Sequence, residues 1–135
     1  MDEDIIEYCK KTITLINDYS NNYEKIIALV LREIKDNEYV YINRHNRWYK
    51  YDKDIKEWKE TNFRVILLDR VNGLYEFFDS IMIIYLNTQN ILPISNRTRL
   101  INISRRIAEN IYEERIDLNR LEREFKIAFK IDTGI

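Results

Sequence analysis

The chain has 135 residues, of which 45% are hydrophobic and 33% are charged, and its formal net charge at pH 7 is −1. This composition excludes intrinsic disorder as the default state, and the length predicts a single domain over residues 1–135. The near-neutral balance gives no global attraction to nucleic acid, so any such binding must come from local patches. Two glycines and one proline are too few for the turns of an all-β fold, which favours helices.

Apolar residues recur at three- and four-residue steps near the N-terminus, and this spacing predicts two helices. The first runs from about Asp2 to Asn17, with acidic side chains where a helix N-terminus favours negative charge. The polar cluster from Asp18 to Asn22 ends this helix. The second helix presents one apolar face, formed by Tyr23, Ile26, Ile27, Val30, Leu31 and Ile34.

The stretch from Asn37 to Glu60 is rich in aromatic and β-branched residues, and it holds both tryptophans and the only histidine. We expect strands at Glu38–Ile42, at Trp48–Tyr51 and around Trp58, separated by turns at Asn43–Asn46 and Asp52–Asp54. These elements predict a small antiparallel β-meander of two or three strands inserted into a helical domain.

After the meander, Thr61 is the expected N-cap of a long helix. Its apolar residues step by four, three, four, three and four, at Leu67, Val71, Leu74, Phe78, Ile81 and Tyr85. This heptad-like seam indicates either a central core helix or a homodimer through the Leu67–Tyr85 helix. Gly73 inside it marks close packing or a break into two helices.

Two further helices complete the expected fold. A loop at Asn87–Ser95 contains the only proline, Pro93, and Ser95 is the expected N-cap of the helix that follows. Asp117 is the expected N-cap of the last helix. The predicted fold class is mainly α within α+β, with about five helices and a small inserted antiparallel β-meander.

Positive charge is concentrated in two stretches. Between Arg44 and Lys59 a basic residue occurs at every third position, and six basic residues against three acidic ones give this span a net charge of +3. Cations neutralise phosphates and aromatic rings stack on bases, so this composition is typical of a nucleic-acid-binding surface. The same composition is equally typical of a half-buried hairpin with a solvated outer face. The second stretch lies on the helix after Ser95, whose first half carries arginines and no acidic residue. It is either a second nucleic-acid-binding patch or an ordinary solvated helix face.

The candidate nucleic-acid-binding residues come from both stretches. They are Arg44, His45, Arg47, Trp48, Tyr49, Lys50, Arg97 and Arg99. The arginines and the lysine are expected to contact phosphates, whereas Trp48 and Tyr49 are expected to stack on bases or to shape the hairpin.

Residues suited to catalysis or metal binding are scarce. His45 and Cys9, the only residues of their types, stand on different predicted elements, which argues against a metal site and against nucleophilic catalysis. No GxxxxGK[ST] or GxGxxG loop is present. We therefore expect a non-catalytic protein with no cofactor and no metal site, in which Cys9 is a core thiol.

The segment Trp48-Tyr49-Lys50-Tyr51-Asp52, followed by Trp58-Lys59-Glu60, resembles the module that precedes the helicase core in the primase-helicases of large DNA viruses. This family includes the poxvirus nucleoside triphosphatase. The resemblance covers roughly residues 38–86. After this module the family continues with a Phe and then an apolar residue followed by Asp, and Phe129 followed by Ile131 and Asp132 loosely resembles that pattern. The chain lacks the family's ATP-binding loop. The resemblance therefore implies an excised or borrowed module with a replication-related role beside DNA.

The main hypothesis is a non-catalytic nucleic-acid-binding or replication-accessory module with DNA or RNA as its partner. The alternative is a helical protein–protein interaction module or homodimer, or a small viral effector that binds a host protein through an apolar groove. A single cysteine, no recognisable signal peptide and no apolar run of membrane-spanning length predict an intracellular protein, in the cytoplasm or the virus factory of an infected cell. The main hypothesis requires the two cationic stretches to form one continuous surface.

Overall fold

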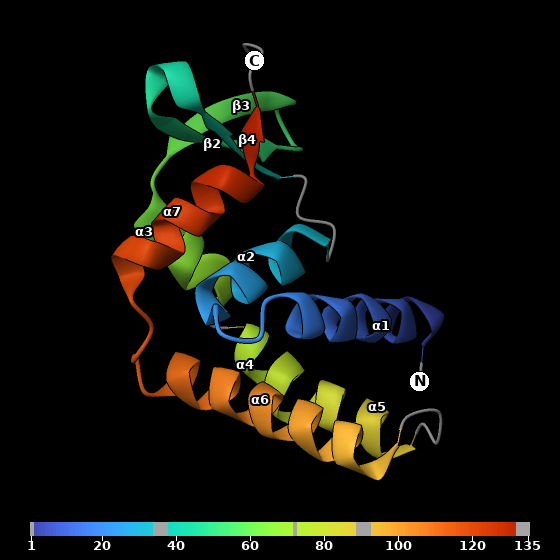
Figure 1. The fold of residues 1–135 in the computed structure, drawn as a ribbon. Helices are drawn as coiled ribbons and strands as arrows, with labels where there is room; N and C mark the ends of the chain where they lie inside the picture. Colours follow the sequence, from blue (N-terminus) through green and yellow to red (C-terminus); the bar gives the residue numbers. More distant parts are fainter. Residues whose placement is uncertain (1, 34–37, 72, 89–92, 132–135) are drawn as a thin grey trace.

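The computed structural model of the chain describes residues 2–33, 38–71, 73–88 and 93–131, and it places a small β-sheet at one end of a group of helices (Figure 1). The expected fold class, mainly α within α+β, is confirmed. One cluster of buried side chains joins the helices to the sheet. Among the described residues, no helix combines the length and the apolar character that a membrane crossing requires.

The two N-terminal helices form from the periodic stretches that predicted them. Helix α1 spans Glu3–Asp18, and the carboxylate of Asp2 caps it by accepting a hydrogen bond from the amide nitrogen of Asp4 at 2.7 Å. Helix α2 spans Tyr23–Glu33 and packs against α1. Its predicted apolar face is largely buried, whereas Ile34 lies outside the described residues.

The predicted β-meander is confirmed. Strands β1 (Tyr39–Ile42), β2 (Arg47–Asp52) and β3 (Glu57–Thr61) pair in antiparallel fashion, and the 3-10 turn η1 (Asn43–His45) joins β1 to β2. Successive side chains along β2 point to opposite faces of the sheet, so Trp48 and Lys50 lie toward the helices whereas Tyr49 and Tyr51 lie away from them.

A fourth strand, β4 (Lys130–Ile131), extends the meander into a mixed sheet with the order β3-β2-β1-β4. It pairs in parallel with β1, and the amide of Tyr41 donates a hydrogen bond to the carbonyl of Phe129 at 3.0 Å. Sequence periodicity did not indicate β4, because two residues are too few to show an alternation. Asp132, which belongs to the Phe129–Asp132 pattern that resembles the primase-helicase family, lies outside the described residues.

The stretch predicted as one long helix is instead a series of short elements. It contains α3 (Phe63–Ile66), η2 (Leu67–Val71), α4 (Leu74–Glu76), η3 (Phe77–Ile81) and α5 (Met82–Thr88). The segments η2 and η3 are π-helical, so each of them shifts the face that the next turn presents to the core. The expectation of one continuous helix is therefore corrected, and the alternative of a break at Gly73 is the one that the structure supports.

The start of this stretch also differs from the prediction. Asn62 caps α3, because its side-chain oxygen accepts a hydrogen bond from the amide of Val65 at 3.0 Å. Thr61, the predicted cap, is the last residue of β3 and pairs with Trp48. The meander thus runs directly into α3, with a single residue between strand and helix.

The heptad-like seam lies in the core of the same chain. Its members Val71, Leu74, Phe78 and Tyr85 are at most 5% exposed. A homodimer through this seam would have to expose that core, so the structure favours the core role over the dimer role. Gly73 lies at the N-terminal end of α4, at the break between η2 and α4.

Helices α6 (Ile94–Tyr112) and α7 (Leu118–Ala128) complete the fold. Pro93 is the N-cap of α6, so Ser95, which was predicted to be the cap, lies inside the first turn. The predicted cap of α7 is confirmed, because the carboxylate of Asp117 accepts a hydrogen bond from the amide of Arg120 at 3.1 Å. Residues 89–92 of the predicted loop lie outside the described residues.

One buried hydrogen bond fastens α6 to the π-helical segment η3. The hydroxyl of Ser104 donates to the carbonyl of Phe78 at 2.6 Å, and both residues are 0% exposed. Helix α6 packs lengthwise on α4, η3 and α5, at the end of the molecule opposite the sheet (Figure 1).

Candidate nucleic-acid interface

The helix-facing side of the sheet is occupied by core aromatics, among them Trp48. Its ring lies 5.1 Å from Tyr41 and 6.2 Å from both Phe63 and Phe129, and it is only 4% exposed. A ring in this position has no free face for a nucleic-acid base. Of the two roles predicted for Trp48, the burial of its ring disfavours stacking on bases and favours shaping the hairpin.

The opposite side of the sheet carries a second aromatic group. Tyr49 and Tyr51 alternate with Trp48 along β2, and Trp58 pairs with Tyr51 across to β3. The rings of Tyr51 and Trp58 lie 5.1 Å apart at an angle of 33°. All three side chains are half-buried rather than enclosed. We call Tyr49, Tyr51 and Trp58 the outer aromatic face.

Of the three residues of this face, only Tyr49 was among the predicted binding residues, whereas Tyr51 and Trp58 were not. Strand alternation was the signal that would have found them, because residues 49 and 51 share one face of β2 and residue 48 occupies the other. The cross-strand partner of Tyr51 then places Trp58 on the same side. The choice of Trp48 followed from composition, which does not distinguish the two faces.

Most cations of the meander have carboxylate partners. Arg47 Nη1 lies 2.9 Å from Glu60 Oε1, and Lys50 Nζ lies 3.5 Å from Asp69 Oδ2. Lys53 and Lys59 form ion pairs with Glu38 and Asp52 at 3.2 Å and 3.5 Å.

These partners cancel the positive charge of the meander. The six cations from Arg44 to Lys59 are accompanied by the three carboxylates within that span and by Glu38, Glu60 and Asp69, so the local net charge falls from +3 to zero. The ion pairs are largely solvent-exposed and individually weak, so a phosphate can compete for each cation. Charge alone, however, does not make this surface attractive to nucleic acid.

Two predicted site residues stand at the η1 turn. Arg44 and His45 are exposed, and neither side chain has a hydrogen bond or an ion pair with any described residue. Asn46 follows them in the left-handed conformation, with φ of 50°, and its side-chain oxygen accepts a hydrogen bond from the hydroxyl of Tyr41. This contact fixes the turn that presents Arg44 and His45 beside the strand bearing Tyr49.

The second cationic stretch, at the start of α6, does not lie beside the meander. Arg97 and Arg99 lie near the start of α6, and the sheet lies at the other end of the molecule (Figure 1). The guanidinium of Arg99 donates a hydrogen bond to the side chain of Asn17 on α1, and Arg97 is half-buried. The predicted residues therefore form two separate surfaces, and the continuous surface required by the main hypothesis is absent from the described structure.

The pKa of Asp52, in the turn between β2 and β3, is shifted by its surroundings. The carboxylate of Asp52 accepts hydrogen bonds from the amides of Asp54 and Ile55 at 3.0 Å and 3.4 Å. The Asp54 amide in particular, with help from the Lys59 ammonium, lowers the pKa of Asp52 below its ordinary value. These interactions keep the β2–β3 turn folded at neutral pH.

Outside the meander, Cys9 is 0% exposed, which confirms it as a core thiol. Burial raises the pKa of the Cys9 thiol to about 11. Within the described ranges no group of three or more His, Cys, Asp and Glu side chains is arranged to hold a metal ion.

Comparison of the chain with protein-family models, curated proteins and solved structures gives no match. The resemblance to the primase-helicase module therefore stays a prediction.

Proposed function

We propose that the protein is a non-catalytic nucleic-acid-binding module that holds single strands on its outer aromatic face. The observation that supports this proposal is the gathering of Tyr49, Tyr51 and Trp58 on the sheet side turned away from the helical core. Successive bases stack on such aromatic side chains irrespective of sequence. A duplex hides its base faces, so a stacking surface favours single strands.

The cations play a secondary part in this proposal. Arg44 and His45 flank the outer aromatic face without a carboxylate partner among the described residues, and Arg47 is held by an exposed ion pair with Glu60. Few phosphates are therefore neutralised, and the affinity falls only shallowly with salt. Arg97 and Arg99, at the far end of the molecule, do not contribute to this surface.

The two tryptophans provide a direct test, because one belongs to the core and the other to the outer aromatic face. Oligothymidylate longer than the roughly 4–16 nucleotides that one such surface covers should quench the fluorescence of Trp58 but not that of Trp48. The Trp48→Phe variant is expected to keep the quenching, and Trp58→Phe to lose it. Trp58→Ala should weaken binding by roughly 5- to 150-fold, the equivalent of one lost base stack.

Arg99→Ala is the matched control for charge, because it removes a cation from α6 and leaves the sheet unchanged. It is expected to bind oligothymidylate as the unmodified chain does. Three results would contradict the proposal: no binding at low salt, tighter binding to duplex than to single strands, or loss of binding in Arg99→Ala with Trp58→Ala unaffected.

A further inference from the structure

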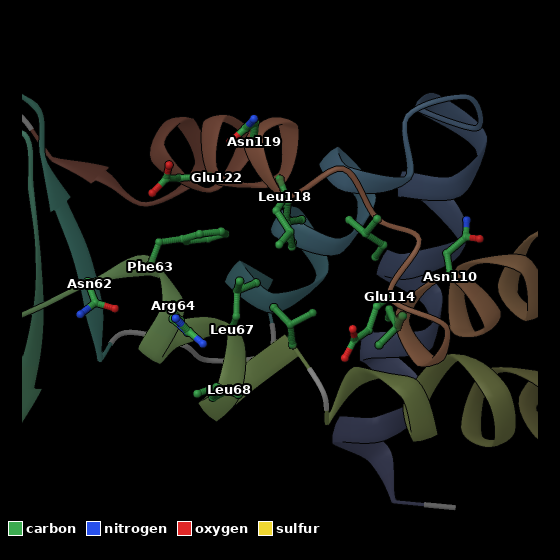
Figure 2. Close-up of a pocket in the computed structure, with 14 residues that line it drawn as sticks. Asn62, Phe63, Arg64, Leu67, Leu68, Asn110, Glu114, Leu118, Asn119 and Glu122 are labelled. Atoms are coloured by element: carbon green, nitrogen blue, oxygen red, sulfur yellow. The ribbon is translucent and has the colours of Figure 1, made fainter.

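A groove with a volume of about 830 Å³ lies beside the sheet, away from the outer aromatic face. Figure 2 shows side chains of α3 and η2 on one wall and side chains of α7 on the other, with the C-terminal end of α6 closing one end. The floor consists of buried apolar residues, namely Phe63, Val71, Ile111 and Leu121. Its size and its apolar floor match those of binding sites rather than packing defects.

The rims of the groove are apolar and exposed. Leu68 on the η2 wall is 69% exposed, and Leu118 on the α7 wall is 57% exposed. Large exposed apolar side chains on both walls of a groove, with polar residues beside them, mark a surface that another molecule covers.

Two backbone irregularities fall at the same place. The wall segment η2 is π-helical, and Glu114 at the closed end has a φ of 54°, which is costly for a residue with a Cβ. Features of both kinds occur preferentially at functional sites. The interpretation of the groove as a binding site thus rests on local backbone conformation as well as on exposed apolar side chains.

The walls indicate what form of occupant fits. The described lining residues belong to helices or to the short connections beside them, so this part of the groove offers no strand edge to which an extended peptide can add. An occupant must therefore satisfy its own backbone hydrogen bonds, as an α-helix does. A helix with apolar residues at i, i+3 or i+4, and i+7 presents a ridge that fits between Leu68 and Leu118.

The charged residues that line the groove indicate which charges the bound helix carries. The carboxylates of Glu114 and Glu122 form no hydrogen bond or ion pair with any described residue, and Glu122 is half-buried. Arg64, the one cation among the described lining residues, stands on the α3 wall, opposite Glu122 (Figure 2). Glu122 lies on the α7 wall and Glu114 at the closed end of the groove, and unpaired carboxylates at these two places favour a partner that brings cations to them.

We propose that this groove binds an amphipathic α-helix of a partner protein, with lysine or arginine residues on the edge that faces α7 and at the end that reaches Glu114. The apolar ridge of that helix covers Leu68 and Leu118, and its cations pair with Glu114 and Glu122. This surface is separate from the outer aromatic face, so the protein is able to hold a nucleic-acid strand and a protein helix at the same time.

The probe for this proposal is a synthetic fluorescein-labelled helical peptide with a leucine ridge and lysines along one edge. We expect saturable binding by fluorescence anisotropy, and at least tenfold weaker binding when glutamates replace the lysines. Leu68→Ser and Leu118→Ser are each expected to weaken binding about tenfold. Ile127→Ser is the matched control, because Ile127 is 69% exposed on α7 but does not line the groove, and it should bind normally.

A charge reversal gives the decisive comparison. Glu122→Lys should bind the glutamate peptide better than the lysine peptide, which a nonspecific apolar surface would not do. Absence of saturable binding, equal losses in Ile127→Ser and Leu118→Ser, or an unchanged peptide preference in Glu122→Lys would each overturn the proposal. So would a dimer in sedimentation experiments that Leu68→Ser dissociates, because the groove would then be filled by a second copy.

Discussion

The hydrogen bond between Ser104 and Phe78 offers a measurable test of how η3 is held. Replacing Ser104 by alanine removes the only donor that α6 extends to the Phe78 carbonyl, and both residues are fully buried. Losing such a bond costs about 1 kcal/mol, and leaving the buried carbonyl without this partner raises the cost to about 1–3 kcal/mol. The higher helix propensity of alanine returns about 0.5 kcal/mol. We therefore expect Ser104→Ala to lower the free energy of unfolding by about 1–2 kcal/mol.

Thr98→Ala is the matched control in the same helix. The hydroxyl of Thr98 also donates to a backbone carbonyl, that of Ile94 at 3.0 Å, but this bond is local and exposed. Its loss should change the free energy of unfolding by less than about 0.5 kcal/mol. The contrast between the two variants therefore isolates the buried bond to η3 from the general effect of removing a hydroxyl.

Urea unfolding followed by far-UV circular dichroism gives both free energies, and the slope with denaturant should be the same in all variants. In thermal unfolding we expect Ser104→Ala to melt roughly 3–8 °C lower than the unmodified chain. If Ser104→Ala and Thr98→Ala unfolded at the same urea concentration, the bond would contribute nothing and the reasoning would be refuted.

Three further outcomes are expected. Lys56→Gly should stabilise the fold by about 0.5–1 kcal/mol in urea unfolding, because Lys56 has a φ of 55° that glycine adopts without strain; a loss of stability would contradict this. Because the pKa of Asp52 is lowered in the folded state, its ionisation stabilises the fold above the ordinary value of 3.8, and this stabilisation is lost as the pH falls through the folded-state pKa. Asp52→Asn should therefore flatten the acid side of the stability–pH curve, and an unchanged curve would exclude this role. Cys9 should resist a thiol reagent at pH 8 until the chain unfolds, since burial raises the pKa of its thiol to about 11, and rapid labelling of the native protein would refute its burial.

Local signals in the sequence predicted much of the fold. Asp117 begins α7 as predicted, and Asp2 caps α1 at the start of the first expected helix, because a carboxylate that accepts a backbone amide acts over a few residues only. The meander followed from strand propensity and turn residues, which are equally local. The π-helical segments η2 and η3 were not predicted, because a π-turn depends on packing against distant residues rather than on local preference.

The candidate site was predicted less well, for a physical reason. Whether a cation is available depends on the carboxylates around it, and Asp69, the partner of Lys50, comes from η2 rather than from the meander. The separation of Arg97 from the meander likewise depends on how the helices pack. Composition indicates which residue types are present, but the fold decides which charges cancel and which rings face solvent.

The short strand β4 has a consequence for how the chain reaches its native state. Residues 130 and 131 complete the edge of β1, so the sheet closes only when segments from distant parts of the chain meet. Until then, β1 presents unpaired amides and carbonyls, which invite association with other unfinished chains. Contacts of such long sequence separation slow folding, so assembly of the sheet is expected to be the late and vulnerable step, whereas α1 and α2 pair early.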